Sequence, residues 1–298
     1  MSEAAFGRGT PQVAPGGPSQ CGDRGQDVSH AQTFPLVDRR SGLSLREFRQ
    51  EYLYPQRPVV ITDASRGWAA NRKWTFSFFG SRYGQDRVRI YRYDKQNEFR
   101  EDAAEQVSFA AYIDAITTQD WSSYPYYLRD NWRLLREHPE LAGDYREPEY
   151  FFDWYRVLPK FLRMPYPRLF LGPKGAVTPL HSDIWGTHAW LSQIVGRKRW
   201  ILFSPAQRDL HYGSQVRVDA PDLDKYPRYR EVRPIEATIG PGDTIFVPSR
   251  WAHWVVSLDP TISLTGNYMA YGCFGIALSS TMREFFIDKV GGRLRRRA

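Results

Sequence analysis

The 298-residue chain has few cysteines and no long apolar run. Only Cys21 and Cys273 occur, far apart in the sequence, and this pattern argues against a disulfide framework and for a reducing compartment. No apolar stretch approaches the roughly 18 residues needed to span a bilayer, and the N-terminus lacks the apolar core of a signal peptide. The sequence therefore predicts a cytoplasmic protein without a membrane partner.

Aromatic and basic residues are abundant by contrast. Phenylalanine, tryptophan and tyrosine make up 15% of the chain, with ten tryptophans, and they can supply large buried surfaces to a single domain. The formal net charge is +8, and residues 293–297 concentrate part of it in four arginines. We interpret this basic end as a solvated tail, so nucleic acid is not an expected partner.

Composition divides the chain into three parts. Residues 1–30 are rich in Gly, Pro, Ser and Gln and cannot bury enough apolar surface to offset the entropy of ordering, so we predict a disordered N-terminal tail. Residues 31–290 are long enough for one large, mainly β domain with added helices. Residues 291–298 form the basic C-terminal tail.

Local patterns predict several elements of the central domain. A capping-box pattern at residues 44–47 opens a short helix, and apolar spacing at residues 109–116 indicates an amphipathic helix. Alternation at residues 87–93 indicates a half-exposed strand, and residues 57–61, 126–128 and 168–172 are predicted strands. A last helix from Thr281 is expected to contribute to the core or to a homodimer contact. Residues 206–236 are polar and aperiodic, and a loop of that length is often functional.

Three side chains suggest one metal site: His181 and Asp183, separated by one residue, and the distant His253. Residues two apart point to the same side of a strand, so the first pair is expected to reach one ion from one face. Two imidazoles and one carboxylate leave half of an octahedral sphere open, which suits ferrous iron. In the alternative interpretation, the short motif merely lies in a hydrogen-bonded turn. His188 is a competing ligand, but Gly186 interrupts the strand between them. We interpret His188 as a packed or exposed residue, and a contact with the substrate or with a metal ligand is the alternative.

The sequence around both halves of this motif indicates a β-barrel. Val195-Gly196-Arg197-Lys198 precedes the apolar run Trp200-Ile201-Leu202-Phe203, and Pro241-Gly242-Asp243 precedes Thr244-Ile245-Phe246-Val247. Each tight turn that opens a strand is interpreted as part of a hairpin.

Together these stretches closely resemble the JmjC family over about residues 35–275. That family consists of cupin-fold oxygenases that use iron(II) (Fe²⁺), 2-oxoglutarate and O₂. The stretch from His181 to Pro205 is especially similar to the JmjC lysyl-hydroxylase branch. The resemblance implies a mainly β fold, a double-stranded β-helix (jelly-roll or cupin) barrel with flanking α-helices, and makes residues 31–290 the catalytic domain.

The resemblance also implies roles for individual residues. The metal ligands and catalytic residues would be His181, Asp183 and His253. Lys198 would pair with the distal carboxylate of 2-oxoglutarate, although Arg197 and Arg199 could be confused with it. The other residues matching the cosubstrate pocket are Thr178, Tyr127 (with Tyr126 as its alternative), Thr265 and Asn267.

The tryptophans near the motif fall into two groups. Trp190 and Trp254 are expected in the core, whereas Trp185 and Trp251 either wall the substrate entrance or pack. The chain departs from the commonest family pattern at Ala252, where a bulky aromatic residue often precedes the distal histidine.

The implied reaction is hydroxylation of a C–H bond, with lysine in a peptide or protein favoured as the substrate. Acidic residues of the long polar segment, Asp219, Asp222 and Asp224, could attract a basic substrate. Three alternatives stay open: hydroxylation of a small metabolite or natural-product peptide, N-methyl-lysine demethylation, and a non-catalytic cupin-like binding protein.

Overall fold

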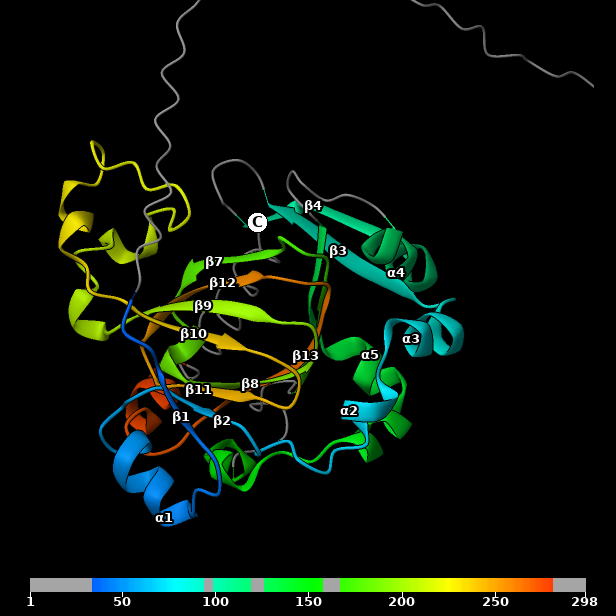
Figure 1. Ribbon diagram of the computed structural model, residues 1–298, viewed down its shortest axis with the longest axis horizontal. Helices are drawn as coiled ribbons and strands as arrows, with labels where there is room; N and C mark the ends of the chain where they lie inside the picture. Colours follow the sequence, from blue (N-terminus) through cyan, green and yellow to red (C-terminus); the bar gives the residue numbers. More distant parts are fainter. Residues whose placement is uncertain (1–33, 94–98, 119–125, 158–166, 281–298) are drawn as a thin grey trace, which may run out of the picture. The chain divides into compact units, whose positions relative to one another are not determined.

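The computed structural model describes residues 34–93, 99–118, 126–157 and 167–280 (Figure 1). The predictions for residues 1–30, for Cys21, for the helix from Thr281 and for the basic tail lie outside these residues. In the described part of the chain, no helix combines the length and apolarity that a membrane crossing requires.

Eight strands form the barrel as two four-stranded layers that face each other (Figure 1). One layer has the order β11-β8-β13-β6 and the other β10-β9-β12-β7. Except for β9 and β10, which pair within the smaller layer, consecutive strands alternate between the layers. This is the arrangement of a jelly-roll double-stranded β-helix, and it confirms the predicted fold. The strands are β6 (Arg168–Gly172), β7 (Val177–His181), β8 (His188–Val195), β9 (Lys198–Phe203), β10 (Ile235–Ile239), β11 (Thr244–Val247), β12 (Ala252–Ser257) and β13 (Thr261–Tyr268).

The predicted hairpins are wrong in one respect. The turn at Gly196 joins β8 to β9, but β8 pairs with β11 and β13, whereas β9 pairs with β10 and β12. The turn before β11 crosses between the layers in the same way. Glycine in a tight turn signals a chain reversal, but it does not decide whether the two strands pair or face each other across a core. Gly196 has φ of 72°, and a Cβ there would lie 2.1 Å from the Pro260 carbonyl oxygen.

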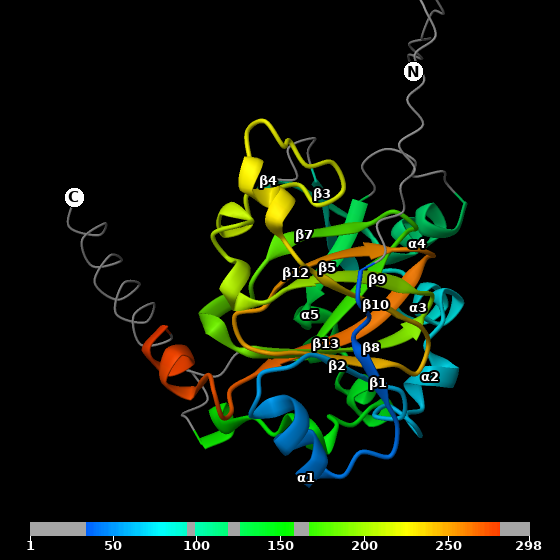
Figure 2. The same ribbon diagram turned by 60° about the vertical axis from the view of Figure 1, so that its left-hand side comes forward.

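The larger layer is extended on both sides, to nine strands. The strands β1 (Asp38–Arg40) and β2 (Val59–Ile61) continue it beyond β11, and β5 (Tyr126–Asn131), β3 (Arg87–Tyr93) and β4 (Phe99–Ser108) continue it beyond β6. Five α-helices flank the barrel, and α3 and α4 pack together on one side of it (Figures 1 and 2). The helices are α1 (Leu45–Phe48), α2 (Ala70–Lys73), α3 (Phe76–Tyr83), α4 (Phe109–Thr118) and α5 (Trp132–Glu137).

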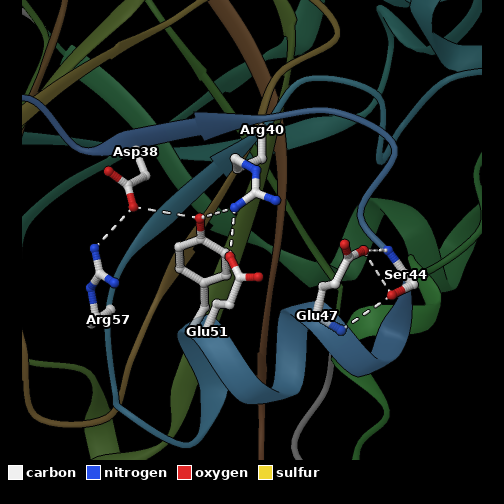
Figure 3. Close-up of polar contacts among 7 residues, drawn as sticks. Asp38, Arg40, Ser44, Glu47, Glu51 and Arg57 are labelled. Carbon is white, nitrogen blue, oxygen red and sulfur yellow. Dashed lines mark hydrogen bonds and ion pairs between the residues drawn. The ribbon is translucent and has the colours of Figure 1, made fainter.

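The predicted capping box begins α1. The Ser44 hydroxyl accepts from the Glu47 backbone N–H at 3.2 Å, and the Glu47 carboxylate accepts from the Ser44 N–H at 2.8 Å (Figure 3). Beyond α1 the helix continues as a π-helical turn, Arg49–Leu53, whose Tyr52 is buried and receives a hydrogen bond from Arg40 of β1 at 2.9 Å. These contacts hold β1 against the helix that follows it.

The predicted amphipathic helix is α4, whose buried residues are Phe109, Tyr112, Ile113 and Ile116. Tyr112 does more than pack, because its hydroxyl donates to the Leu171 carbonyl at 3.0 Å and accepts from the Leu128 N–H at 2.9 Å. The helix therefore fixes β5 against β6, two strands that line the site.

The core has an inner and two outer parts. Inside the barrel, both layers contribute apolar side chains, among them Leu191, Trp200 and Val255. The outer face of the larger layer packs against the helices. The outer face of the smaller layer, including Ile201, Phe203 and Trp254, is covered by the long segment between β9 and β10 through Val216 and Tyr229. This segment is the predicted irregular stretch; it contains short 3-10 turns, and its last two residues belong to β10.

Candidate metal centre and cosubstrate cavity

The two motif histidines are direct cross-strand partners. β7 ends at His181, β12 begins at Ala252, and His253 stands opposite His181 in the antiparallel register. Their ring centroids lie 4.2 Å apart. Two residues more than 70 positions apart in sequence are thus placed side by side by the pairing of two strands in the smaller layer.

Asp183 joins them from outside the strand. We predicted that one strand carries both His181 and Asp183, but β7 ends at His181, and Asp183 precedes the short 3-10 turn Ile184–Gly186. After β7 the chain turns, and Trp185 and Gly186 both have positive φ, which strand residues do not adopt. Nevertheless, one ligand atom from each of the three residues lies within 4.8 Å of the others. The carboxylate reaches the histidines through loop geometry, and not through strand alternation.

Each histidine has its Nδ1 directed at a backbone carbonyl. The Nδ1 of His181 lies 2.8 Å from the Pro179 oxygen, and the Nδ1 of His253 lies 3.3 Å from the Trp251 oxygen. A neutral ring that donates through Nδ1 keeps the lone pair of Nε2 for a metal ion. Burial lowers the pKa of His181, and the adjacent His253 ring acts in the same direction. The neutral form that a ligand requires is therefore the favoured one at pH 7.

His188 lies apart from this group. Its side chain is fully buried, its Nε2 donates to the Tyr271 carbonyl at 2.8 Å, and its Nδ1 accepts from the Ser249 N–H at 3.0 Å. Both ring nitrogens are thus used by the backbone, which agrees with the interpretation of His188 as a packed residue.

A cavity of about 330 Å³ extends from the metal-ligand group into the barrel. It is lined by every residue assigned to the site by sequence resemblance: Tyr127, Thr178, His181, Asp183, Lys198, His253, Thr265 and Asn267. His253 pairs with Leu202, four residues along β9 from Lys198, a distance of roughly 13 Å along a strand. The histidines and the lysine therefore stand at different depths of one cavity.

Lys198 is the buried cation of this cavity. It is 1% exposed, and its Nζ donates to the Tyr127 hydroxyl at 3.0 Å. Within the described ranges no carboxylate forms an ion pair with it. Burial lowers the pKa of Lys198 to about 7. A buried ammonium group without an anionic partner is costly, so the position favours binding of an anion.

The residues that the sequence left as alternatives to Lys198 and Tyr127 do not face the cavity. Arg197 is exposed and pairs with Asp259 at 2.7 Å, and Arg199 pairs with Glu236 of β10 at 2.6 Å. Neither lines the cavity. Tyr126 contacts Glu105 on the far side of β5, while Tyr127 faces the cavity.

The side chains of Thr265 and Asn267 are oriented by hydrogen bonds to β8 and to the residue before it. The Thr265 hydroxyl donates to the Trp190 carbonyl at 2.6 Å, and the Asn267 amide donates to the Thr187 hydroxyl at 3.0 Å. These bonds fix two side chains of β13 along the wall of the cavity, where each retains hydrogen-bonding capacity for a ligand.

Sequence reasoning missed two cationic residues in the lining. Arg129 of β5 and Arg168 of β6 both border the cavity. A signal for them exists, because Arg129 follows Tyr127 by two positions and Arg168 precedes Phe170 by two, so each shares a strand face with a cavity residue. Both arginines also have contacts within the protein.

The four tryptophans near the motif are all packed against other parts of the protein. Trp190 and Trp254 are 2% and 7% exposed, which confirms a core position, and Trp190 also borders the cavity. Trp185 packs with Tyr155 in a separate apolar cluster, and the indole of Trp251 donates to the Gln56 carbonyl at 2.9 Å. Among the described residues that line the cavity, neither Trp185 nor Trp251 occurs. The structure therefore favours a packing role for both over a place at the substrate entrance.

The donor set fits iron(II) and a dicarboxylate. Two imidazole nitrogens and one carboxylate converge without any thiolate, which leaves coordination positions for oxygen-donor ligands. At the other end of the same cavity, a buried lysine and a tyrosine hydroxyl are placed to receive a carboxylate.

Comparison with known proteins indicates the same fold. A family model described as a cupin-like domain matches residues 45–271. The 2-oxoglutarate and iron-dependent oxygenase JMJD4 of Gallus gallus is 31% identical over 261 residues, covering 80% of this chain and 60% of the relative.

Two further relatives carry different activities in their names. The lysine-specific demethylase JMJ21 of Arabidopsis thaliana is 34% identical over 253 residues, covering 80% of this chain and 26% of the relative. The bifunctional arginine demethylase and lysyl-hydroxylase psr-1 of Caenorhabditis briggsae is 30% identical over 271 residues, covering 84% and 65%. The chain thus spans less than two thirds of the length of these relatives.

Proposed function

The chain belongs to the cupin-like JmjC family, and from this premise we propose that it is an iron(II)- and 2-oxoglutarate-dependent dioxygenase that hydroxylates a C–H bond. One observation carries the proposal. His181, Asp183 and His253 converge at one end of a cavity, and the buried Lys198 lines the same cavity. A metal site or a buried lysine alone would fit many proteins. Their occurrence in one cavity fits a metal ion and a dicarboxylate bound together.

Each residue then has a defined task. The three ligands hold iron(II) and leave one face of it open, while Lys198 and the Tyr127 hydroxyl bind the distal carboxylate of 2-oxoglutarate. Thr178, Thr265 and Asn267 border the same space and can donate to carboxylate oxygens. The carbonyls of Pro179 and Trp251 keep the imidazoles oriented.

Bound iron(II) supplies the oxygen chemistry, in which O₂ and 2-oxoglutarate give succinate, carbon dioxide and one oxygen atom inserted into a substrate C–H bond. The protein contributes orientation and exclusion of water. Trp200, Val247 and Val255 supply an apolar part of the cavity wall.

We favour an amino-acid side chain in a peptide or protein as the substrate, with lysine first. This choice is supported by the names of the relatives, one of which is a lysyl-hydroxylase, and by the similarity from His181 to Pro205. Demethylation of an N-methyl group is the second candidate, because JMJ21 and psr-1 carry demethylase names. The same oxidation on an N-methyl carbon would release formaldehyde. Oxidation of a small metabolite or natural-product peptide, and binding without turnover, are the remaining alternatives.

One feature of the earlier prediction, the attraction of a basic substrate by acidic residues, loses support. Asp219 is paired with Arg217 at 2.7 Å, and Asp222 accepts hydrogen bonds from the backbone of Asp224 and Lys225. Acidic attraction of a basic substrate by this segment is therefore weaker than its sequence suggests. A homodimer contact through the C-terminal helix stays a prediction, as does a cytoplasmic location, which the scarcity of cysteine supports.

The function is tested by mass spectrometry. Peptide and metabolite libraries are incubated with the protein, iron(II), 2-oxoglutarate and oxygen, and searched for a gain of one oxygen atom, while methylated lysine and arginine peptides are assayed for formaldehyde. We expect a stable oxygenated lysine-containing peptide. Stoichiometric formaldehyde without such a product would instead assign demethylation, and oxidation confined to free metabolites would remove the peptide part of the proposal.

A further inference from the structure

A second cavity, of about 400 Å³, also borders the metal-ligand group. His181 and Asp183 border both cavities, whereas Lys198 borders only the first. The second cavity is built from three loops at the same end of the barrel: the turn after β7, the start of the long segment between β9 and β10, and the turn before β12. Apart from His181 and Asp183, it shares no lining residue with the cosubstrate cavity.

The charge of this lining is positive. Arg208 and Arg250 contribute two guanidinium groups, and Asp183 is the only carboxylate among the lining residues. Asp183 is assigned to the metal ion. Neither arginine has an ion-pair partner among the residues that the structure describes, in contrast to Arg197, Arg199 and Arg217, which all do.

Arg250 occupies a strained backbone position. Its φ is 65°, in the left-handed region that glycine adopts without strain and that costs a larger residue about 1 kcal/mol or more. The turn itself is rigid, because the Ser249 N–H donates to His188 at 3.0 Å and the Ser249 hydroxyl donates to the Gly186 carbonyl at 2.6 Å. A strained arginine in a fixed turn at the edge of a cavity is typical of a functional position.

His211 adds a buried donor to the same cavity. Its side chain is 2% exposed, and its Nδ1 accepts from the Ser214 N–H at 2.9 Å. In the neutral ring the proton therefore resides on Nε2, for which the described residues provide no hydrogen-bond partner. Burial lowers the pKa of His211, which favours this neutral form.

We infer that this cavity is a substrate subsite for an anionic oxygen group, such as a carboxylate, bound by Arg208, Arg250 and His211 beside the metal ion. Two guanidinium groups and one N–H donor can supply charge-assisted hydrogen bonds to both oxygens of a carboxylate. The inference rests on the proposed function and refines its substrate class: the oxidised C–H bond belongs to a molecule that carries an acidic group nearby. For a peptide, this predicts an acidic residue close to the oxidised one.

The test measures binding of charge-matched probes to the full chain loaded with Mn²⁺ and saturating 2-oxoglutarate in the absence of oxygen. Fluorescent peptides share one central lysine and carry glutamate, glutamine or lysine on either side. N-acetylglutamate and its uncharged analogue N-acetylglutamine serve as small-molecule competitors. The variants are Arg250→Gly, Arg208→Ala and their combination, with Arg228→Ala as a control because Arg228 is exposed in the same segment and does not line the cavity.

We expect the glutamate peptides to bind about tenfold more tightly than the glutamine peptides, as charge-assisted hydrogen bonds predict. The preference should fall to within about twofold in the double variant and persist in Arg228→Ala. Arg250→Gly should lose affinity while its melting temperature stays the same or rises, because glycine removes the strain. A fold defect would lower both.

Each other outcome has a defined meaning. Competition by N-acetylglutamate but not N-acetylglutamine, with no charge preference among the peptides, would support the anion subsite and make a small acidic molecule its occupant. Absence of any preference for the acidic probe, a preference for the lysine-flanked peptides, or an unchanged preference in the double variant would overturn the inference. Succinate formation by the same preparation is measured separately, so that failure of the oxygenase proposal is distinguished from failure of the subsite.

Discussion

The rings of His181 and His253 lie with centroids 4.2 Å apart across the antiparallel pair β7–β12. A separation this short would be unfavourable for two protonated rings, and it suits two neutral rings that share one cation. We expect His181→Ala and His253→Ala each to weaken metal binding by one to two orders of magnitude, measured by calorimetry with Mn²⁺. The control is His138→Ala, a histidine paired with Asp86 far along the chain. Retention of metal by His253→Ala together with its loss in His188→Ala would place the third ligand elsewhere.

Lys198→Met tests the cosubstrate assignment. Removing the buried cation should lower the affinity for 2-oxoglutarate by an amount corresponding to about 2–5 kcal/mol, while metal affinity changes little. Arg197→Met and Arg199→Met are matched controls, because these cations pair with Asp259 and Glu236 outside the cavity. Calorimetric titration of the metal-loaded proteins measures the effect. Equal losses in all three variants would contradict a specific role for Lys198.

Binding of 2-oxoglutarate should depend on pH through the same residue. In the free protein the pKa of Lys198 is lowered to about 7. A carboxylate beside Nζ raises it, so binding takes up a proton above pH 7. Affinity should then fall up to about tenfold per pH unit from pH 7 upward. Titrations in buffers of different ionisation enthalpy at pH 8 should show uptake of close to one proton in the wild type and none in Lys198→Met.

The stability of the protein without cosubstrate should show the cost of this buried cation. The folded pKa of Lys198, about 7, lies below the unfolded value of 10.5, so the unfolded chain binds more protons between these values. Stability from this residue therefore rises as pH increases from 7 to 10.5. Lys198→Met should remove that rise and raise the melting temperature at pH 7. A lower melting temperature of the variant at pH 7 would contradict this account.

The buried His188 should make the folding stability of the protein sensitive to acid. Burial lowers its pKa from 6.5 to about 4, and its two ring nitrogens bond the backbone at Tyr271 and Ser249. Stability contributed by the neutral ring is complete above pH 6.5 and is lost progressively as pH falls toward 4, because the unfolded chain takes up the proton. His188→Gln should be less stable at pH 7 and less sensitive to pH in that window, as denaturant titrations can measure. An unchanged pH slope would mean that the ring is not held neutral.

The sequence was sufficient for the parts of the fold that depend on local chemistry. The capping box at Ser44, the apolar spacing of α4 and the alternation in β3 each have a local cause, and each prediction is confirmed. The turns at Gly196 and Gly242 were recognised, but their strands face each other across the core instead of pairing. That choice depends on contacts between residues distant in sequence.

The candidate site likewise has features that the sequence predicts and features that depend on long-range packing. The residue types and the resemblance identified a set of side chains that all line one cavity, and strand register explains why His181 and His253 meet. The position of Asp183 in a loop, the contributions of Arg129 and Arg168, and the second cavity with Arg208 and Arg250 depend on how loops and edge strands pack. No local pattern encodes these relationships.

The most direct test of the central claim is succinate formation from 2-oxoglutarate without added substrate. The purified chain is incubated with iron(II), oxygen and isotopically labelled 2-oxoglutarate, and labelled succinate is quantified for the wild type, His181→Ala, Lys198→Met and the control Arg197→Met. We predict slow succinate formation that depends on iron in the wild type and Arg197→Met, and none above background in the other two variants. Wild-type protein that binds iron and 2-oxoglutarate but forms no succinate, or His181→Ala that forms it at the wild-type rate, would contradict the assignment of this cavity as an oxygenase site.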